Sequence, residues 1–253
     1  AASGTLTFDA GDTTATFTVP VLADSYPENN ETATMTLSNA PNATLSDATG
    51  TLTITDDDSI SFTGTTINQG LSDQAREVFL ADMDSDGDLD IVVSSSKDNT
   101  VAWFENDGAA NPGFSHANIA TNARGGADVV VADMDADGDL DIVSASSGDD
   151  TIAWYENDGA ANPTWSSADI ATSANGAYSV DVADMDGDGD LDIVSASDTD
   201  NTIAWYEHDG ASDPSWSSAN IVTNVDGARG LSVADMDGDG DFDIVSAARD
   251  DDA

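Results

Sequence analysis

The chain has 253 residues, among them 50 acidic and 5 basic side chains, and its formal net charge is −45. Five scattered cations cannot build the basic surface that displaces counterions from nucleic acid, and an anionic membrane surface would repel this chain. We therefore expect no nucleic-acid partner and no membrane insertion, and no run of about 18 apolar residues occurs that would span a bilayer.

The composition favours a folded protein that binds cations. Hydrophobic residues make up 39% of the chain, which argues against disorder. Of the acids, 44 are Asp and 6 are Glu, and Asp is typical of turns and metal loops rather than helices. Because so much like charge opposes compaction, we expect bound cations to offset it. Cysteine is absent, so no disulfide or thiolate site contributes, and no signal peptide is visible.

Residues 1–58 alternate between threonine and apolar side chains. Period-two alternation predicts strands with one half-buried face, and hence part of an antiparallel β-sandwich. The run Asp56-Asp57-Asp58 marks the joint to the next domain. The alternating segments are residues 5–8, 14–19, 32–37 and 51–55.

This first domain resembles the C-terminal half of a Calx-beta domain. The resemblance rests on residues 4–8, 28–32 and 53–58. That family can bind Ca²⁺ through acidic loops at one end of its sandwich, which implies Asp24, Glu28 and Asp56 to Asp58 as candidate ligands. An ordinary acidic linker is the alternative interpretation of the same residues.

Residues 59–253 are tandem copies of one unit. The nonapeptide Asp-Met-Asp-Ser-Asp-Gly-Asp-Leu-Asp begins at Asp82 and recurs nearly unchanged from Asp133, Asp184 and Asp235, always 51 residues apart. Each complete unit contains four short β-branched or aromatic segments bounded by turn residues, and no window has a helical period. Four antiparallel strands in a repeat of this length are typical of a β-propeller blade. We therefore predict an all-β protein: β-propeller blades preceded by part of a β-sandwich.

The ends of the repeat region predict a partial ring. The fourth copy stops at Ala253, after two predicted strands, and Ser61 to Gly70 stands where an outer strand would precede the first inner strand. We interpret residues 59–253 as about four blades of a larger propeller, the last one incomplete. A closed four-bladed ring is the alternative.

The repeated Asp loop has the chemistry of a calcium site. Asp at positions 1, 3, 5 and 9 supplies hard oxygen ligands, position 7 would add its backbone carbonyl, and Gly at position 6 permits the sharp turn. No His or Cys lies nearby, which disfavours Zn²⁺ and copper, and a roomy all-oxygen cage suits Ca²⁺ better than Mg²⁺. An EF-hand would need a Glu at position 12, where this chain has Val93 or Ser; solvated acidic turns are the remaining alternative. The predicted sites, about four in all, comprise Asp82, Asp84, Asp86, Asp88 and Asp90; Asp133, Asp135, Asp137, Asp139 and Asp141; Asp184, Asp186, Asp188, Asp190 and Asp192; and Asp235, Asp237, Asp239, Asp241 and Asp243.

The motif Asp-x-Asp-x-Asp-Gly-Asp-Leu-Asp-Ile-Val at this spacing resembles FG-GAP (VCBS-type) repeats. These build integrin-α-like β-propellers, usually seven-bladed, with Ca²⁺ in the hairpin between the first two strands of a blade. The Gly-Ala-Pro of the family name is replaced here by Ser144-Ala145-Ser146 and its equivalents. The resemblance therefore implies the bacterial branch, and an extracellular or cell-surface location.

Few residues suggest a second site. Arg76, Tyr178 and Arg229 occupy one repeat position six residues before an Asp loop, and Arg124 lies in an equivalent connection. These residues are candidates for binding a carboxylate of a glycan or protein ligand, although they would equally neutralise neighbouring Asp. The repeated Trp residues are expected to pack between adjacent sheets.

Two functional hypotheses follow. The first is a non-enzymatic, Ca²⁺-stabilised adhesion or ligand-binding module of a large secreted bacterial surface protein, whose ligand is a glycan or a protein of a cell surface or matrix. The second is an accessory or catalytic part of a secreted polysaccharide-degrading enzyme of the lyase type. An acidic surface adapted to high salt is a competing explanation of the charge, and any salt, rather than Ca²⁺ alone, would then stabilise the chain.

Overall fold

The structure, a computed structural model, describes residues 3–22, 28–56, 58, 64, 66–67, 70–71 and 74–250. Every regular element within these residues is a β-strand, and no helix occurs among them, which confirms the predicted all-β fold. None of the described segments, accordingly, is a helix long and apolar enough to cross a membrane. The chain divides into two compact units, residues 1–66 and 67–253.

The first unit contains one strand pair. Strand β1 (Glu31–Thr36) pairs antiparallel with β2 (Thr49–Ile54), so two of the four predicted segments form strands. The described residues 3–22 form none, and Phe8 and Phe17 are more than half exposed because no further strand there covers them. A single strand pair is not a sandwich, and the resemblance to a Calx-beta domain stays a prediction.

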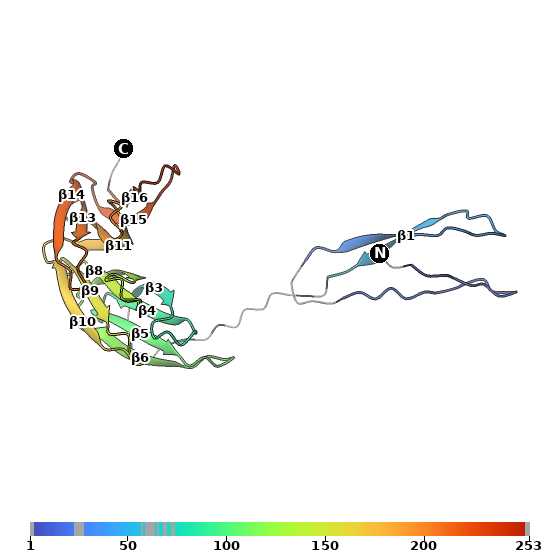
Figure 1. Ribbon diagram of the computed structural model, residues 1–253, viewed down its shortest axis with the longest axis horizontal. Helices are drawn as coiled ribbons and strands as arrows, with labels where there is room; N and C mark the ends of the chain where they lie inside the picture. The colour runs from blue at the N-terminus through green and yellow to red at the C-terminus, as the bar shows by residue number, and fades with distance from the viewer. Residues whose placement is uncertain are drawn as a thin grey trace. The chain divides into compact units, whose positions relative to one another are not determined.

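The second unit consists of three four-stranded antiparallel sheets and one two-stranded sheet (Figure 1). Within each sheet the strands follow chain order, as in a meander, and each inner strand is the first of its repeat. The first sheet contains β3 (Ala75–Ala81), β4 (Asp90–Ser95), β5 (Thr100–Asn106) and β6 (Phe114–Ala120); the second β7 (Gly126–Ala132), β8 (Asp141–Ser146), β9 (Thr151–Asn157) and β10 (Trp165–Ala171); the third β11 (Ala177–Ala183), β12 (Asp192–Ser197), β13 (Thr202–His208) and β14 (Trp216–Val222); and the fourth β15 (Ala228–Ala234) and β16 (Asp243–Ala248).

The four sheets are blades that follow one another along an arc and do not close into a ring (Figure 1). The inner strands β3, β7, β11 and β15 are successive neighbours. Side-chain bonds join them: the Asp128 carboxylate on β7 accepts the Ser179 hydroxyl (2.7 Å) and the Val180 N–H (3.0 Å) of β11. The fourth blade has two strands in the described residues, as expected, whereas most of the leading strand expected over Ser61 to Gly70 lies outside the described residues.

The hydrophobic cores lie between consecutive blades. One core joins Val143, Ile152 and Trp154 of the second blade to Val180 and Ile193 of the third. A second core joins the first blade to the second in the same way. The repeated Trp residues of these two blades, Trp103 and Trp154, are therefore buried, as expected. Each blade thus needs a neighbour to cover its sheet.

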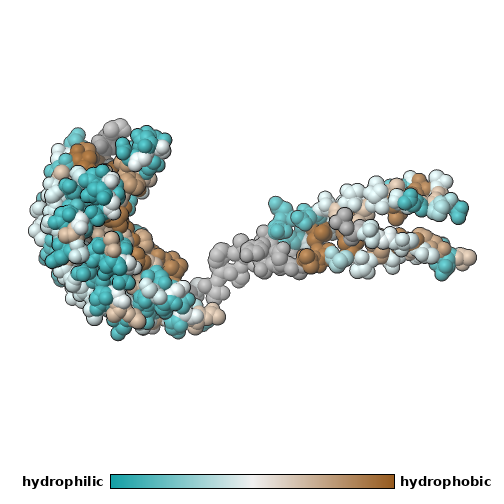
Figure 2. Space-filling view, in the orientation of Figure 1, coloured by the Kyte–Doolittle hydropathy of each residue, from teal (hydrophilic) through white to brown (hydrophobic). Residues whose placement is uncertain are grey.

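The end blades show the consequence of that dependence. Val78 and Leu80 on β3 are each 57% exposed, and Val245 on β16 is 49% exposed, although equivalent positions are covered inside the arc. The outer side of the arc is mainly hydrophilic, and hydrophobic residues gather on its inner side (Figure 2).

Candidate metal centres

Each Asp loop is the hairpin between the first two strands of a blade. The register of these strand pairs ends at Ala81↔Asp90 and Ala132↔Asp141, and it is the same in the third and fourth blades. The loop leaves the inner strand directly after this pair and returns at position 9. Strand pairing therefore fixes both ends of the nonapeptide.

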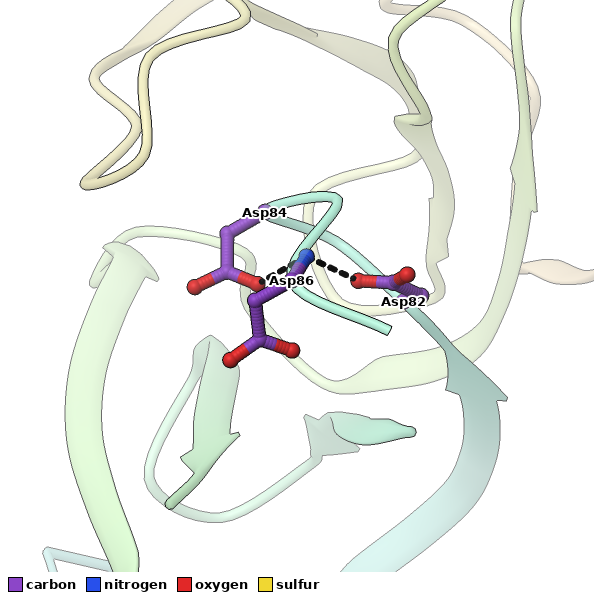
Figure 3. A group of neighbouring side chains, drawn as sticks. All are labelled: Asp82, Asp84 and Asp86. Atoms are coloured by element: carbon purple, nitrogen blue, oxygen red, sulfur yellow. Dashed lines mark hydrogen bonds between the residues drawn. The ribbon is translucent and has the colours of Figure 1, made fainter. Parts of the chain in front are cut away.

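The first three acids of each loop converge, as Figure 3 shows for the first loop. In the first blade one carboxylate oxygen from each of Asp82, Asp84 and Asp86 lies within 4.8 Å of the others. The Asp82 carboxylate organises the turn, because it accepts the N–H groups of Asp86 (3.0 Å) and Gly87 (3.0 Å). The same triplets form in every repeat: Asp133, Asp135 and Asp137; Asp184, Asp186 and Asp188; Asp235, Asp237 and Asp239.

The backbone curl depends on glycine at position 6. Gly87, Gly138, Gly189 and Gly240 have φ angles between 98° and 103°, a conformation in which other side chains are strained. Position 4 also has a positive φ, and in the first two loops it is occupied by Ser85 and Ala136, at 60° and 58°. The loops of the third and fourth blades have glycine at that position as well.

The acid at position 9 lies outside the triplet. Asp141 is 1% exposed, and its two oxygens accept the N–H groups of Met134 (3.1 Å) and Asn157 (2.8 Å). Asp90 and Asp192 make the equivalent bonds in their blades. This side chain therefore ties the loop to the third strand, and its role as a metal ligand stays a prediction.

The acid at position 7 points toward another turn. The carboxylates of Asp88, Asp139 and Asp190 lie against the glycine of the Asn-Asp-Gly or His-Asp-Gly turn that follows the third strand, so closely that a Cβ there would collide. The sequence predicted that the backbone carbonyl at position 7 is a metal ligand. The position of the side chain does not test this, and it stays a prediction.

One structural residue of the loops was not anticipated. Asn157 is 2% exposed, and its side-chain amide donates to the carbonyl of Leu140 in its own loop (3.1 Å) and of Met83 in the preceding loop (2.9 Å). It thus links two Asp loops 51 residues apart. The sequence contained the signal, because Asn106 and His208 occupy the same position after the repeated Trp-x-Glu segment.

In the first two loops, burial and like charge disfavour the charged form of the acid at position 3. Burial, with the charges of Asp86 and Asp90, raises the pKa of Asp84, and burial with Asp137 raises the pKa of Asp135. Burial alone is the main reason that the pKa of Asp141 is raised to about 7. A cation beside the triplet would favour the charged carboxylates. The donor set is all oxygen, so the residues present fit a hard divalent ion such as Ca²⁺.

The candidate ligand residues are only partly brought together. Arg76, Tyr178 and Arg229 meet, although 153 residues separate the first from the last in the sequence. The exposed Arg124 side chain makes no hydrogen bond or ion pair within the described residues, and its backbone N–H donates to Asp149 (3.1 Å).

Among the candidate ligands of the first unit, the Asp56 carboxylate is bonded to backbone. Asp56 accepts the N–H groups of Glu28 (2.8 Å) and Asp58 (3.1 Å). Asp24 and Asp57 lie outside the described residues. Among the residues of this unit that the structure describes, no group of three acids converges as the loop triplets do.

Fold and site together define a class: an all-β protein of tandem blades, each with an acidic hairpin loop able to hold a metal ion. A comparison with protein families matches the FG-GAP-like repeat at residues 82–144, 133–195 and 184–246, which together span well over half of the chain. The chain therefore belongs to the FG-GAP-like repeat family. A comparison with curated proteins found no significant match.

Proposed function

We propose that this chain is a calcium-binding, non-enzymatic adhesion or ligand-binding module of a large secreted or surface bacterial protein. The observation that carries the proposal is the repetition of one Asp triplet, with carboxylate oxygens within 4.8 Å, at the same hairpin of all four blades. Membership of the FG-GAP-like repeat family supports a repeat-built binding module. In this proposal Ca²⁺ rigidifies each hairpin and neutralises the charge of its carboxylates.

The donor set suits Ca²⁺ in number as well as in chemistry. Ca²⁺ takes six to eight oxygen ligands in flexible geometry, whereas Mg²⁺ demands an octahedron and retains waters. The triplet supplies three carboxylates, and positions 7 and 9 are the proposed sources of further oxygens. Each oxygen of Asp141 accepts one backbone N–H, and a carboxylate has about four acceptor sites, so acceptor capacity remains for an ion.

Ca²⁺ binding then stabilises the blades by mass action. Extracellular modules bind Ca²⁺ with dissociation constants of about 10⁻⁴–10⁻³ M, so these sites fill outside cells and empty in a cytosol. At 10 mM Ca²⁺ each filled site adds roughly 1.4–2.7 kcal/mol to the free energy of unfolding, provided that the unfolded chain does not bind the ion.

Thermal unfolding as a function of Ca²⁺ concentration tests the proposal. At constant ionic strength the melting temperature should rise through the millimolar range of Ca²⁺ and fall when EGTA is added. Substituting Asp137→Asn should reduce the rise, whereas Asp169→Asn, which removes the same charge from an exposed position on β10, should not.

Two results would contradict the proposal. An equal stabilisation by NaCl or Mg²⁺ would favour an acidic surface adapted to salt instead. Release of unsaturated products from an acidic polysaccharide would favour the lyase-type alternative.

A further inference from the structure

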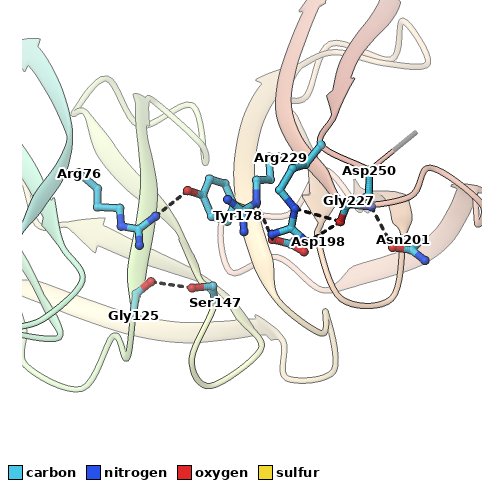
Figure 4. A network of polar contacts seen from close by, with 10 residues as sticks. Arg76, Gly125, Ser147, Tyr178, Asp198, Asn201, Gly227, Arg229 and Asp250 are labelled. Carbon is cyan, nitrogen blue, oxygen red and sulfur yellow. Dashed lines mark hydrogen bonds and ion pairs between the residues drawn. The ribbon is translucent and has the colours of Figure 1, made fainter. Parts of the chain in front are cut away.

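Three of the five basic residues of this chain lie in one cluster, and two of them, Arg76 and Arg229, contact Tyr178 (Figure 4). Arg76 donates to the Tyr178 hydroxyl (2.6 Å), and its guanidinium carbon lies 5.4 Å from the centre of the ring. The guanidinium carbon of Arg229 lies 4.6 Å from the same centre. Arg249 joins them through Asp198, which it shares with Arg229. In a chain of net charge −45, this concentration of cations is the exception.

The repeat brings these side chains together. Arg76, Tyr178 and Arg229 are the second residues of the inner strands β3, β11 and β15, and Ala127 holds that position on β7. Because the Ala127 side chain is short and buried, Arg76 reaches past the second blade to the third. The cluster lies at the end of the inner strands opposite the Asp loops.

The cluster contains more guanidinium groups than carboxylates to pair with them. Asp198 accepts from Arg229 (2.6 Å) and from Arg249 (3.4 Å), and Asp250 pairs with Arg249 (2.5 Å). Arg76 has no carboxylate partner among the described residues, and only one of its five N–H groups has a bond there. The Tyr178 hydroxyl accepts from Arg76, which leaves its own proton to donate.

The backbone beneath the cluster is held in place. The Gly176 N–H, two residues before Tyr178, donates to Asp150 in the preceding blade (2.8 Å). The Gly227 N–H, two residues before Arg229, donates to Asn201 in the same manner (3.0 Å). Binding at this position would therefore require little rearrangement of the backbone.

We propose that Arg76, Tyr178 and Arg229 form a binding site for a carboxylate side chain of an acidic peptide segment in a partner protein. This inference rests on the proposed function, since it names the partner of a binding module. The carboxylate accepts N–H groups of Arg76 and the Tyr178 hydroxyl proton, in the planar arrangement that guanidinium and carboxylate groups favour.

Two observations favour a peptide over an acidic glycan. The Tyr178 ring is already contacted by two guanidinium groups, and all five Trp residues are buried or half-buried, so the cluster offers little free aromatic surface for sugar stacking. A polyuronate carries a negative charge on every sugar, which a chain of net charge −45 repels, whereas a peptide segment with only one or two acidic side chains avoids most of that repulsion.

The test is peptide binding by the full chain in saturating Ca²⁺, measured by fluorescence anisotropy. The probe is a fluorescent Gly-Ser peptide with one central Asp-Glu pair, and its Asn-Gln counterpart is the peptide control. The acidic peptide should bind at least tenfold more tightly. Arg76→Gln should weaken binding by about tenfold or more, and Tyr178→Phe by a smaller factor. Lys97→Gln, which removes the same charge from an exposed position outside the cluster, should retain wild-type affinity.

Three outcomes would overturn the inference: equal binding or equal losses, preference for a glycan, and no peptide binding at all. Equal binding of the two peptides, or equal losses for Arg76→Gln and Lys97→Gln, would mean that binding depends only on the long-range electrostatic potential of the protein. Preferential binding of oligogalacturonate would assign the cluster to a glycan. Unchanged melting temperatures of the variants in Ca²⁺ exclude misfolding as the cause. If Ca²⁺ stabilises the chain but the peptide does not bind, the further inference fails and the proposed function stands.

Discussion

Replacing Met134 with alanine tests whether an Asp loop is anchored in the core between two blades. Met134 is position 2 of the second loop and is 2% exposed, and it packs in the core that joins the second and third blades. The truncation removes buried methylene and sulfur groups and leaves a cavity, so the free energy of unfolding should fall by about 2–5 kcal/mol. Urea unfolding in saturating Ca²⁺ measures this loss.

Met236 provides the matched control, because it occupies the same position of the fourth loop and is 66% exposed. Met236→Ala should change the free energy of unfolding by no more than about 0.5 kcal/mol. Equal losses for the two variants, or a loss below about 0.5 kcal/mol for Met134→Ala, would refute the view that the following blade anchors the loop.

Three further substitutions test the link between loops, the glycine of the turn and a buried acid between blades. Asn157→Ala leaves the buried carbonyl of Met83 and the part-buried carbonyl of Leu140 without their amide donor. It should cost about 1–3 kcal/mol in urea unfolding, more than Asn106→Ala, whose amide has one carbonyl partner. Gly138→Ala has open space but φ of +100°, so backbone strain of about 1–3 kcal/mol should lower stability and Ca²⁺ affinity together; loss of neither would show that the turn tolerates a side chain. Burial raises the pKa of Asp128 above 3.8, so the folded protein binds a proton at this site at a higher pH than the unfolded chain does. The free energy of unfolding should therefore decrease as the pH rises from about 4 through the folded pKa. Asp128→Asn should remove this decrease, and parallel pH profiles of the two proteins would contradict the prediction.

The repeat made most of the second unit predictable. The 51-residue spacing of the Asp loops and the turn residues around them predicted four antiparallel strands per blade, and the structure confirms this order. The same residue types recur at the same positions of several copies, so a strand pattern that is weak in one copy becomes clear when three copies are compared. The convergence of positions 1, 3 and 5 followed from the same reasoning.

Other features depended on contacts that a local pattern does not contain. The bond from Asn157 to Met83 joins two blades, and the approach of Arg76 to Tyr178 passes over a third, so neither could be deduced from spacing within one copy. In the first unit, alternation predicted strands over residues 5–8 and 14–19, where the structure has none. Alternation of apolar and polar residues shows that a strand could bury one face, but the strand forms only where a second strand pairs with it.

The central claim is that each Asp loop binds one Ca²⁺ ion, and a calorimetric titration of the metal-free chain with Ca²⁺ tests it most directly. We expect about four ions bound per chain with dissociation constants near 10⁻⁴–10⁻³ M, and one fewer when Asp133 and Asp137 are both replaced by asparagine. No binding heat in this range, or an unchanged number of ions in the double variant, would contradict it.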